Sequence, residues 1–347
     1  MAKIISLFNN KGGVSKTTTT FHLSWMLAEK GYKVLMIDTD PQCNLTGLCL
    51  SLAGSNDIED FYEHSGTDNI KDALDPAFSG IPRELTPARC FAFPNRENLY
   101  LLPGHIDFSQ FDVTMGIAQE LTGSMRLSSN IPGAIHHLIS ITAEEYDFDY
   151  VVIDMSPSVT ATNANLLMQS DFFLVPCSPD YFCNMAINSL VNIIPLWKRT
   201  YDRLQTNEVF QHVEYEMPST RPLFVGTIMQ RYRPKNGSPA RSFQSWIDRI
   251  NENVSSHLAP TLQDCGMMVD EQLLRRMSDD GIPFNLINIS DFNSLIAQSQ
   301  KYNVPVFSLS DEQIEQTGVV LTVSRRNKEE FHRVFDRLAD KIINVTA

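Results

Sequence analysis

The stretch from Asn9 to Thr18, NNKGGVSKTT, brings together residue types that bind phosphate. Glycines let backbone N–H groups approach phosphate oxygens, and a helix that begins just after them points its positive end at the same place. A lysine can then reach the terminal phosphates, and a hydroxyl can hold a metal ion. Gly12, Gly13, Lys16 and Thr17 supply these parts. The stretch therefore predicts a phosphate loop for a nucleoside triphosphate with Mg²⁺.

This loop departs from the common spacing G-x-x-x-x-G-K-[ST]. Asn10 and Ser15 stand where that pattern has glycine, and a second lysine, Lys11, lies five residues before Lys16. A Cβ at a left-handed or crowded backbone position costs roughly 1 kcal/mol. We therefore expect nucleotide binding to survive at Ser15, and hydrolysis to be slow.

Three carboxylates follow apolar runs that are typical of buried strands. Asp38 and Asp40 follow one such run, and Asp154 ends another. Ligands of an open parallel sheet lie beyond the carboxyl ends of its strands. A carboxylate next to buried apolar residues is costly unless a metal or hydrogen-bond donors pair with it. We expect a magnesium site formed by Thr17, Asp38 and Asp154.

The surrounding pattern predicts the elements that position these residues. A strand at Lys3–Phe8, a helix at Thr17–Lys30 and a strand at Lys33–Ile37 form a βαβ unit, whose two strands are parallel. Further strands are predicted at Leu99–Leu102, Tyr150–Ile153, Phe172–Val175, Leu223–Met229 and Val306–Leu309. Further helices are predicted at Asn130–Thr142, Ala161–Gln169, Cys183–Tyr201, Phe243–Leu258 and Lys328–Asn344.

Most of the strand candidates are continuous apolar runs, as in parallel sheets that helices cover on both faces. We predict a single α/β domain over residues 1–347, with a doubly wound, mostly parallel sheet. The segments at about 51–98 and 259–282 fit this scheme poorly, as does 208–222, and we interpret the first two as insertions into the domain.

Composition limits the partners. The chain has 347 residues, is 43% hydrophobic and carries a net charge of -13, which does not favour general binding to DNA or anionic lipid. Its six cysteines are scattered, without a zinc or disulfide spacing. No apolar run approaches the ~18 residues of a membrane span, and no export signal is recognisable. We expect a cytoplasmic protein with reduced thiols.

Three motifs in order, NNKGGVSKTTTT, LMIDTDPQCNLT and VVIDMSPS, resemble those of the deviant Walker A ATPases of the ParA/MinD group. The resemblance continues through PCSPDYF and GTIMQRYRP to the segment from Ile282 to Pro305. It implies a SIMIBI-like P-loop NTPase fold, ATP and Mg²⁺ as cofactors, and a homodimer that forms with ATP.

The resemblance also implies a role for each residue of the site. Lys16 would bind the β and γ phosphates, Asp40 would orient the attacking water, and Asp154 would hold Mg²⁺ through water. Lys11 would reach across the dimer interface to the partner's nucleotide. Phosphate contacts are implied for Lys11, Gly12, Gly13, Val14, Ser15, Lys16, Thr17 and Thr18, and contacts near the base for Met229, Gln230 and Pro283.

Two outputs of such an ATP-driven switch stay open. ATP binding and hydrolysis could position DNA, a plasmid or other cargo, with a protein activator stimulating hydrolysis. The alternative is a regulatory or defence ATPase that gates an effector without partitioning DNA. The net charge and the absence of arginine from IPFNLINISDFNS, where DNA-positioning members carry it, lower the expectation of DNA binding. An electron-transfer ATPase is disfavoured because no cysteine pattern for a bridging cluster is present.

Overall fold

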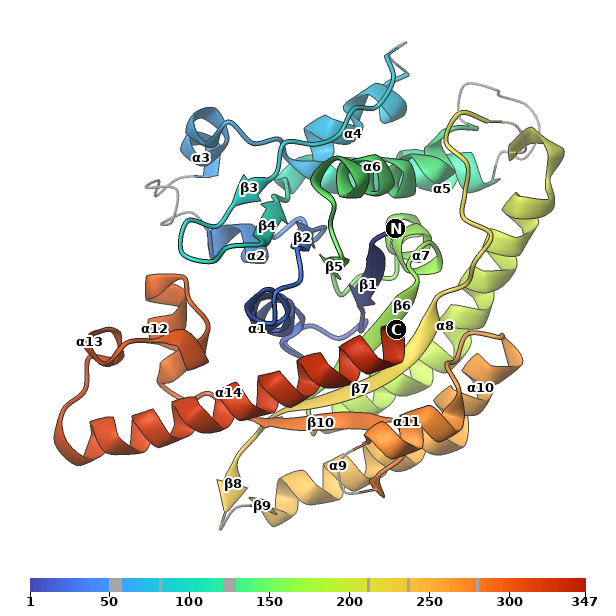
Figure 1. Ribbon diagram of the computed structural model, residues 1–347. Helices are drawn as coiled ribbons and strands as arrows, with labels where there is room; N and C mark the ends of the chain where they lie inside the picture. The colour runs from blue at the N-terminus through green and yellow to red at the C-terminus, as the bar shows by residue number, and fades with distance from the viewer. Residues whose placement is uncertain (50–57, 81–82, 121–128, 211–212, 236–237, 279–280) are drawn as a thin grey trace.

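The computed structural model describes residues 1–49, 58–80, 83–120, 129–210, 213–235, 238–278 and 281–347. Within them, eight strands form one sheet in the order β10-β7-β6-β1-β5-β2-β4-β3 (Figure 1). All neighbours in it are parallel except β3 and β4. The predicted doubly wound α/β fold is confirmed. The strands are β1 Lys3–Leu7, β2 Val34–Asp38, β3 Phe91–Ala92, β4 Leu99–Leu102, β5 Tyr150–Asp154, β6 Phe172–Cys177, β7 Leu223–Tyr232 and β10 Asn285–Ser290.

Helices cover both faces of this sheet, with α1 and α14 along one side and α5 to α8 along the other (Figure 1). A small hairpin of β8 Pro234–Lys235 and β9 Ser238–Pro239 stands apart from the sheet. The helices are α1 Lys16–Glu29, α2 Asn44–Gly47, α3 Ile58–Ser65, α4 Ile70–Phe78, α5 Phe111–Glu120, α6 Ile131–Tyr146, α7 Ala161–Met168, α8 Tyr181–Thr206, α9 Arg241–Asn253, α10 Ala259–Asp264, α11 Glu271–Met277, α12 Leu295–Tyr302, α13 Asp311–Ile314 and α14 Gly318–Thr346. Short 3₁₀ turns lie at η2 Ile106–Gln110, η4 Glu208–Phe210 and η7 Val306–Ser308, and a π-helical turn, η5 Val254–Leu258, extends α9.

Strand β1 occupies the middle of the sheet, between β5 and β6, and this placement organises the site. Ile5 and Leu7 of β1 are completely buried. Because the neighbouring strands run parallel to it, the chain leaves β1, β5 and β6 at the same edge of the sheet. That edge is where ligands of doubly wound folds bind.

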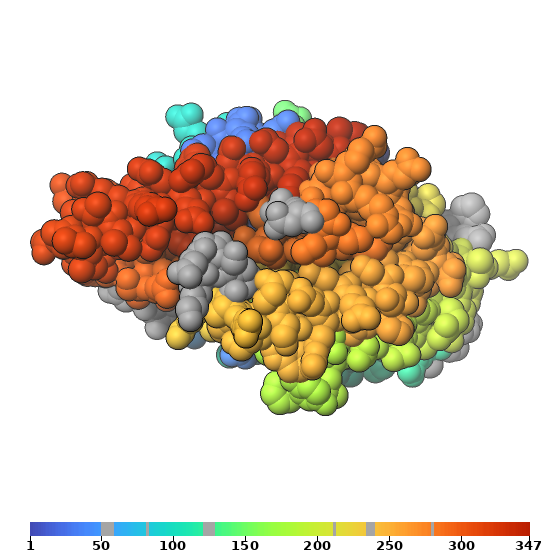
Figure 2. Space-filling view, turned by 90° about the horizontal axis from the view of Figure 1, so that it is seen from below, coloured from blue at the N-terminus to red at the C-terminus, as the bar shows by residue number. Residues whose placement is uncertain are grey.

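The last helix, α14, packs its apolar face against the rest of the domain, as the sequence predicts. Phe331, Phe335, Leu338 and Ile342 are buried. Seen from below, α14 crosses the molecule beside the segments that lead from α8 to α11 (Figure 2). The helix begins at Gly318, ten residues earlier than the predicted Lys328.

One strand prediction near the C-terminus is wrong, and one strand there was not predicted. Val306–Leu309 does not form a strand but the 3₁₀ turn η7, which follows Pro305. The edge strand is instead Asn285–Ser290, whose sequence NLINIS carries two asparagines. The side-chain N–H of Asn285 donates a hydrogen bond to the side-chain oxygen of Asn288 at 2.9 Å, whereas the side-chain oxygen of Asn285 is buried and accepts none from the described residues.

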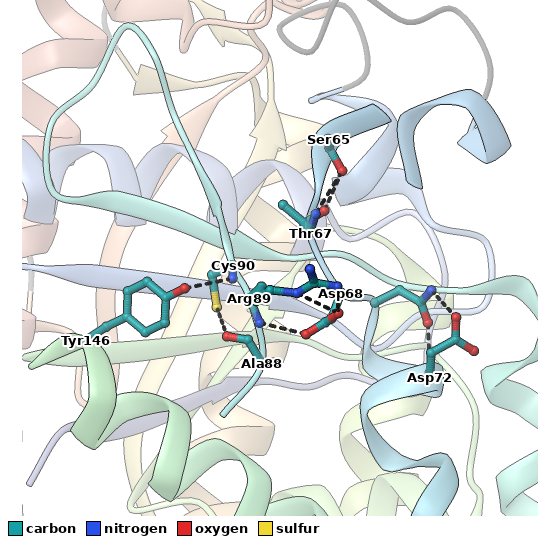
Figure 3. A network of polar contacts seen from close by, with 9 residues as sticks. Ser65, Thr67, Asp68, Asp72, Ala88, Arg89, Cys90 and Tyr146 are labelled. Atoms are coloured by element: carbon teal, nitrogen blue, oxygen red, sulfur yellow. Dashed lines mark hydrogen bonds and ion pairs between the residues drawn. The ribbon is translucent and has the colours of Figure 1, made fainter. Parts of the chain in front are cut away.

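The segment predicted as the first insertion contains α3, α4 and β3, and the second contains α10 and α11. Residues 51–57, 81–82 and 279–280 of these predictions, and 211–212 of the segment 208–222, lie outside the described residues. Arg89 pairs with Asp68 at 2.8 Å, and the backbone N–H of Cys90 donates to the Tyr146 hydroxyl of α6 at 3.3 Å (Figure 3). The first segment is thus bonded to the core. That the segments are insertions stays a prediction.

Candidate nucleotide-binding site

The phosphate loop connects the buried end of β1 to the start of α1 at Lys16. Gly13 has φ 74°, and Ser15 has φ 62° and ψ 33°. The left-handed conformation considered for Ser15 from the sequence is therefore present. A non-glycine residue tolerates it at a cost of roughly 1 kcal/mol, which the surrounding loop must compensate. The N–H groups of the first turn of α1 point toward the loop, as anion sites at helix ends require.

A cavity of about 540 Å³ opens over this loop. Among the residues predicted from the sequence, the whole run Gly12–Thr18 lines it, together with Asp40 and Gln230. The other lining residues come from α1, the loop after β2, the Asp154 loop, the loops after β7 and β10, and α12: Phe21, His22, Gln42, Asn44, Leu48, Pro157, Arg231, Ser290, Asp291, Phe292, Ile296, Ser299 and Gln300. Sequence reasoning missed the contribution of α12.

Lys16 is buried at the floor of the cavity, with 7% of its surface exposed. Its ammonium donates to the backbone carbonyls of Asn9 at 3.1 Å and Lys11 at 3.4 Å. Burial lowers the pKa of Lys16, while the carboxylates of Asp154 and Asp40 raise it. A cation held only by carbonyls in a buried position has unused capacity for an anion, as a phosphate-binding lysine requires.

Asp154 ends β5 beside this lysine and is the least satisfied charged group of the site. Only 1% of it is exposed, and neither carboxylate oxygen accepts a hydrogen bond from the described residues. Burial and then the neighbouring Asp38 raise the pKa of Asp154 to about 8. The Thr17 hydroxyl and Lys16 act in the opposite direction. Two orphaned carboxylate oxygens beside a hydroxyl are the donor set that Mg²⁺ accepts, so the residues fit the metal.

The other two predicted carboxylates differ in their surroundings. Asp38, which faces Asp154 across the β2–β5 pair, accepts hydrogen bonds from the N–H and hydroxyl of Thr46, both at 2.8 Å, and from the N–H of Asp40 at 3.2 Å. Burial raises the pKa of Asp38 to about 6. Its oxygens are therefore engaged in holding the loop after β2. Asp40, in contrast, is partly exposed at the cavity wall, where within the described part of the chain it accepts only from the N–H of Gln42 at 3.0 Å.

Lys11 does not line the cavity. Its ammonium contacts Asp180 at 2.5 Å and the Ser178 hydroxyl at 2.7 Å, both in the turn between β6 and α8. Asp180 also caps α8 by accepting from the N–H of Cys183 at 2.9 Å. Lys11 thus leaves the loop sideways, along the carboxyl edge of the sheet. Sequence reasoning missed this partner, although it lies within the PCSPDYF motif.

The far end of the cavity is formed by the carboxyl ends of β7 and β10. Gln230 is buried there and its side-chain amide contacts the Thr19 hydroxyl, while Arg231 donates to the carbonyl of Gly13 at 2.8 Å. Met229 is completely buried in the sheet. Pro283 precedes β10 and therefore lies at the other end of that strand, away from the cavity. Ser290–Phe292, at the carboxyl end of β10, line the cavity instead.

His22 links this cavity to the C-terminal part of the chain. Its Nδ1 lies 2.7 Å from the carbonyl of Thr18, and its Nε2 accepts from the N–H of Val306 at 3.1 Å. The ring stacks on Phe292 with centroids 5.1 Å apart. Burial lowers the pKa of His22 to about 3, so the ring is neutral and donates through Nδ1. It is a positioning residue of the cavity wall.

Comparison with known proteins agrees with this arrangement. Residues 2–207 match the family model AAA_31, described as an AAA domain. The chain belongs to this family. It is 29% identical over 197 residues to the sporulation initiation inhibitor protein Soj of Bacillus subtilis, an alignment that covers 56% of this chain and 66% of Soj. Other relatives are aligned over 63 to 64% of their lengths, so this chain covers slightly less than two thirds of the first curated relatives.

Solved structures show the same fold. Apo McdA of Cyanothece superposes with a TM-score of 0.57 at 17% identity, covering 94% of this chain and 99% of McdA. A plasmid partition protein of Borrelia burgdorferi bound to AMPPNP superposes with a TM-score of 0.51 at 18% identity, covering 95 and 97% of the two chains. The family model and the similarity to Soj, together with this shared fold, confirm the resemblance to the ParA/MinD group. Among the described residues, no helix is long and apolar enough to cross a membrane.

Proposed function

We propose that the protein is an ATPase that dimerises around ATP and uses the cycle of binding and hydrolysis to control a partner. The observation that carries this proposal is the position of Lys11. The rest of the predicted loop, Gly12–Thr18, lines the cavity, whereas Lys11 points along the sheet edge to Asp180. A lysine that does not line the cavity of its own subunit would be free to serve the phosphates of a second one.

Exposed apolar side chains after three strands of the sheet support such a second subunit. Seven of the twelve exposed large apolar side chains of the described residues follow the carboxyl ends of β4, β5 and β6: Ile106, Val113, Ile117, Val159, Tyr181, Phe182 and Met185. Exposed apolar groups gathered on one side of a molecule are typical of a protein interface. This is the edge at which the nucleotide cavity opens.

Within one site, Lys16 and the loop N–H groups would hold the phosphates, and Thr17 and Asp154 would hold Mg²⁺, which neutralises phosphate charge during transfer. Asp40 lines the cavity with one carboxylate oxygen hydrogen-bonded, and it would orient the attacking water. The left-handed conformation of Ser15 strains the phosphate loop. We therefore expect slow ATP hydrolysis, which a protein activator stimulates. We also propose that the protein acts on a partner protein, as ParA-like proteins do, and that it is located in the cytoplasm.

Oligomeric state in ATP tests the proposal. Asp40→Ala should slow hydrolysis and trap an ATP-bound dimer, which light scattering after gel filtration measures. The double variant Asp40→Ala with Lys11→Ala should bind ATP with the same affinity but remain a monomer. Lys71→Ala, a surface change on α4, serves as the matched control in the same background and should dimerise. If the variant without Lys11 dimerises normally, Lys11 does not act on the nucleotide of the second subunit and the proposal is wrong.

A regulatory ATPase that gates an effector without partitioning DNA is the second candidate. The net charge is -13, and the segment that carries arginines in DNA-positioning relatives forms the edge strand β10 and its flanks, without any arginine. DNA retention with and without ATP at physiological salt separates the two outputs, because phosphate-driven binding needs exposed basic groups. ATP-dependent retention would favour positioning of DNA.

A further inference from the structure

A second cavity lies at the opposite edge of the sheet, where the strands begin. It has a volume of about 590 Å³ and is lined by the first residues of β1, β6 and β7 and by one side of α6. Because the strands are parallel, this edge is separated from the nucleotide cavity by the length of the sheet. Its apolar lining includes Ile4, Ile139, Ala143, Phe148, Phe172 and Leu223, and the charged side chains that also line it are Lys3, Glu144, Asp147, Asp171 and Arg221.

A small chamber adjoins this cavity and shares Ile4, His136 and Ile139 with it. The chamber has a volume of about 10 Å³, which is roughly the room for one water-sized group. Asn165 and Gln169 line it from α7 and the residue after that helix. They are 2% and 5% exposed.

The two amide side chains present unpaired acceptors. Their nitrogens both donate to the carbonyl of Pro132, at 2.8 Å from Asn165 and 2.5 Å from Gln169. A carbonyl only accepts, so these contacts fix which end of each amide is the nitrogen. The side-chain oxygens of Asn165 and Gln169 are buried, and neither receives a hydrogen bond from the described residues.

Burying two acceptors without donors is costly, so a group that donates to both would be held firmly. One NH₂ group carries two hydrogens on one atom and has the size of the chamber. The chamber lining contains no carboxylate, and burial lowers the pKa of His136 to about 4, so the imidazole is neutral at pH 7. An ammonium would be buried there without a counter-charge, which is costly.

We propose that this cavity binds a small neutral molecule that bears a planar amino group, such as a primary carboxamide or an amino heterocycle. Its NH₂ occupies the chamber and donates one hydrogen to Asn165 and one to Gln169. Its ring lies in the larger cavity against Ile139 and Phe172. The site is distinct from the nucleotide cavity, and the inference does not depend on the proposed function.

Calorimetric titration of the full chain with nicotinamide and benzamide tests this inference. Saturating ATP and Mg²⁺ keep the nucleotide cavity filled. Nicotinate and benzoate are matched controls, because their carboxylates have the same shape but only accept hydrogen bonds. The amides should bind at least about tenfold more tightly than the acids, which corresponds to about 1.4 kcal/mol. If neither amide binds, or if the acids bind equally well, the inference is wrong.

Two variants locate the binding. Gln169→Met removes one acceptor while keeping the length of the side chain, and it should weaken nicotinamide binding about tenfold. Ser140→Phe fills the larger cavity from its rim, leaves both amides in place and should abolish binding. Gln244→Met, the same chemical change on α9, should have no effect. ATP affinity is measured in parallel and should not change, which also shows that the variants are folded. Unaltered nicotinamide affinity in Ser140→Phe would place the ligand elsewhere.

Discussion

Replacing Asp154 by asparagine should stabilise the protein in the absence of Mg²⁺ and nucleotide. The folded protein raises the pKa of this carboxyl from 3.8 to about 8, so at pH 7 the carboxyl is ionised in the unfolded chain and must take up a proton on folding, which opposes folding. At about 1.4 kcal/mol for each pKa unit, roughly three of which apply at pH 7, the ceiling is ~4 kcal/mol. The new amide leaves polar atoms unpaired at a cost of about 1–3 kcal/mol. We expect a net gain of ~1–3 kcal/mol.

Urea unfolding in EDTA measures this gain, with Glu252→Gln as the control. Glu252 is exposed on α9, so the same loss of one charge should change stability by less than about 0.5 kcal/mol. The pH dependence has a definite sign. The folded pKa of Asp154 lies above its unfolded value. The contribution of this carboxyl to the free energy of unfolding is therefore fully present below about pH 4 and is lost as pH rises through about 8. Asp154→Asn should remove that decline.

The same variant should lose the magnesium dependence of ATP binding. Wild-type affinity should rise on addition of Mg²⁺, whereas the affinity of Asp154→Asn in Mg²⁺ should remain close to the value in EDTA. Equilibrium titration with a fluorescent ATP analogue measures both. A variant that is less stable than wild type at pH 7 in EDTA would refute the reasoning, since it would mean that the carboxylate is already satisfied inside the protein.

Three further changes have outcomes that follow from the geometry. Ser15→Gly relieves a left-handed Cβ, so the free energy of unfolding should rise by up to about 1 kcal/mol in urea, and ATP affinity should stay within an order of magnitude. Complete loss of binding would contradict this view of the loop. His22 has a folded pKa of about 3, below the unfolded value of 6.5, so it lowers the free energy of unfolding as pH falls. Between pH 7 and pH 5 the His22→Gln variant should therefore lose about 2 kcal/mol less stability than wild type. Equal losses would exclude a buried neutral ring. In Gly133→Ala the new Cβ would lie 1.8 Å from the carbonyl oxygen of Tyr215, so thermal unfolding should show a loss above about 2 kcal/mol, whereas Gly47→Ala has open space and should not.

The central strands could be predicted from the sequence because each is a continuous apolar run followed by a functional motif. The edge strand could not, since the asparagines of NLINIS break the apolar pattern and their mutual hydrogen bond exists only in the folded strand. Val306–Leu309 was wrongly predicted as a strand for the opposite reason. It is apolar and buried, but the N–H of Val306 bonds to His22 and not to a neighbouring strand.

Local spacing was enough to place Gly12–Thr18 around one cavity, because a strand, a glycine loop and a helix form a single unit. It could not give the partner of Lys11, which is 169 positions away at Asp180. It also gave Pro283 a place near the base, because the sequence did not reveal which end of the following strand faces the cavity. The roles of these residues in binding and hydrolysis stay predictions.

Mixing two inactive variants tests the central claim most directly, that the active site is completed by Lys11 of a second subunit. Lys11→Ala keeps its own phosphate loop, and Lys16→Ala keeps Lys11. Each alone should hydrolyse ATP slowly or not at all. If Lys11 acts across the interface, a mixture should regain activity, because one site of each heterodimer pairs an intact loop with the partner's lysine. A mixture as inactive as its two components would contradict the account.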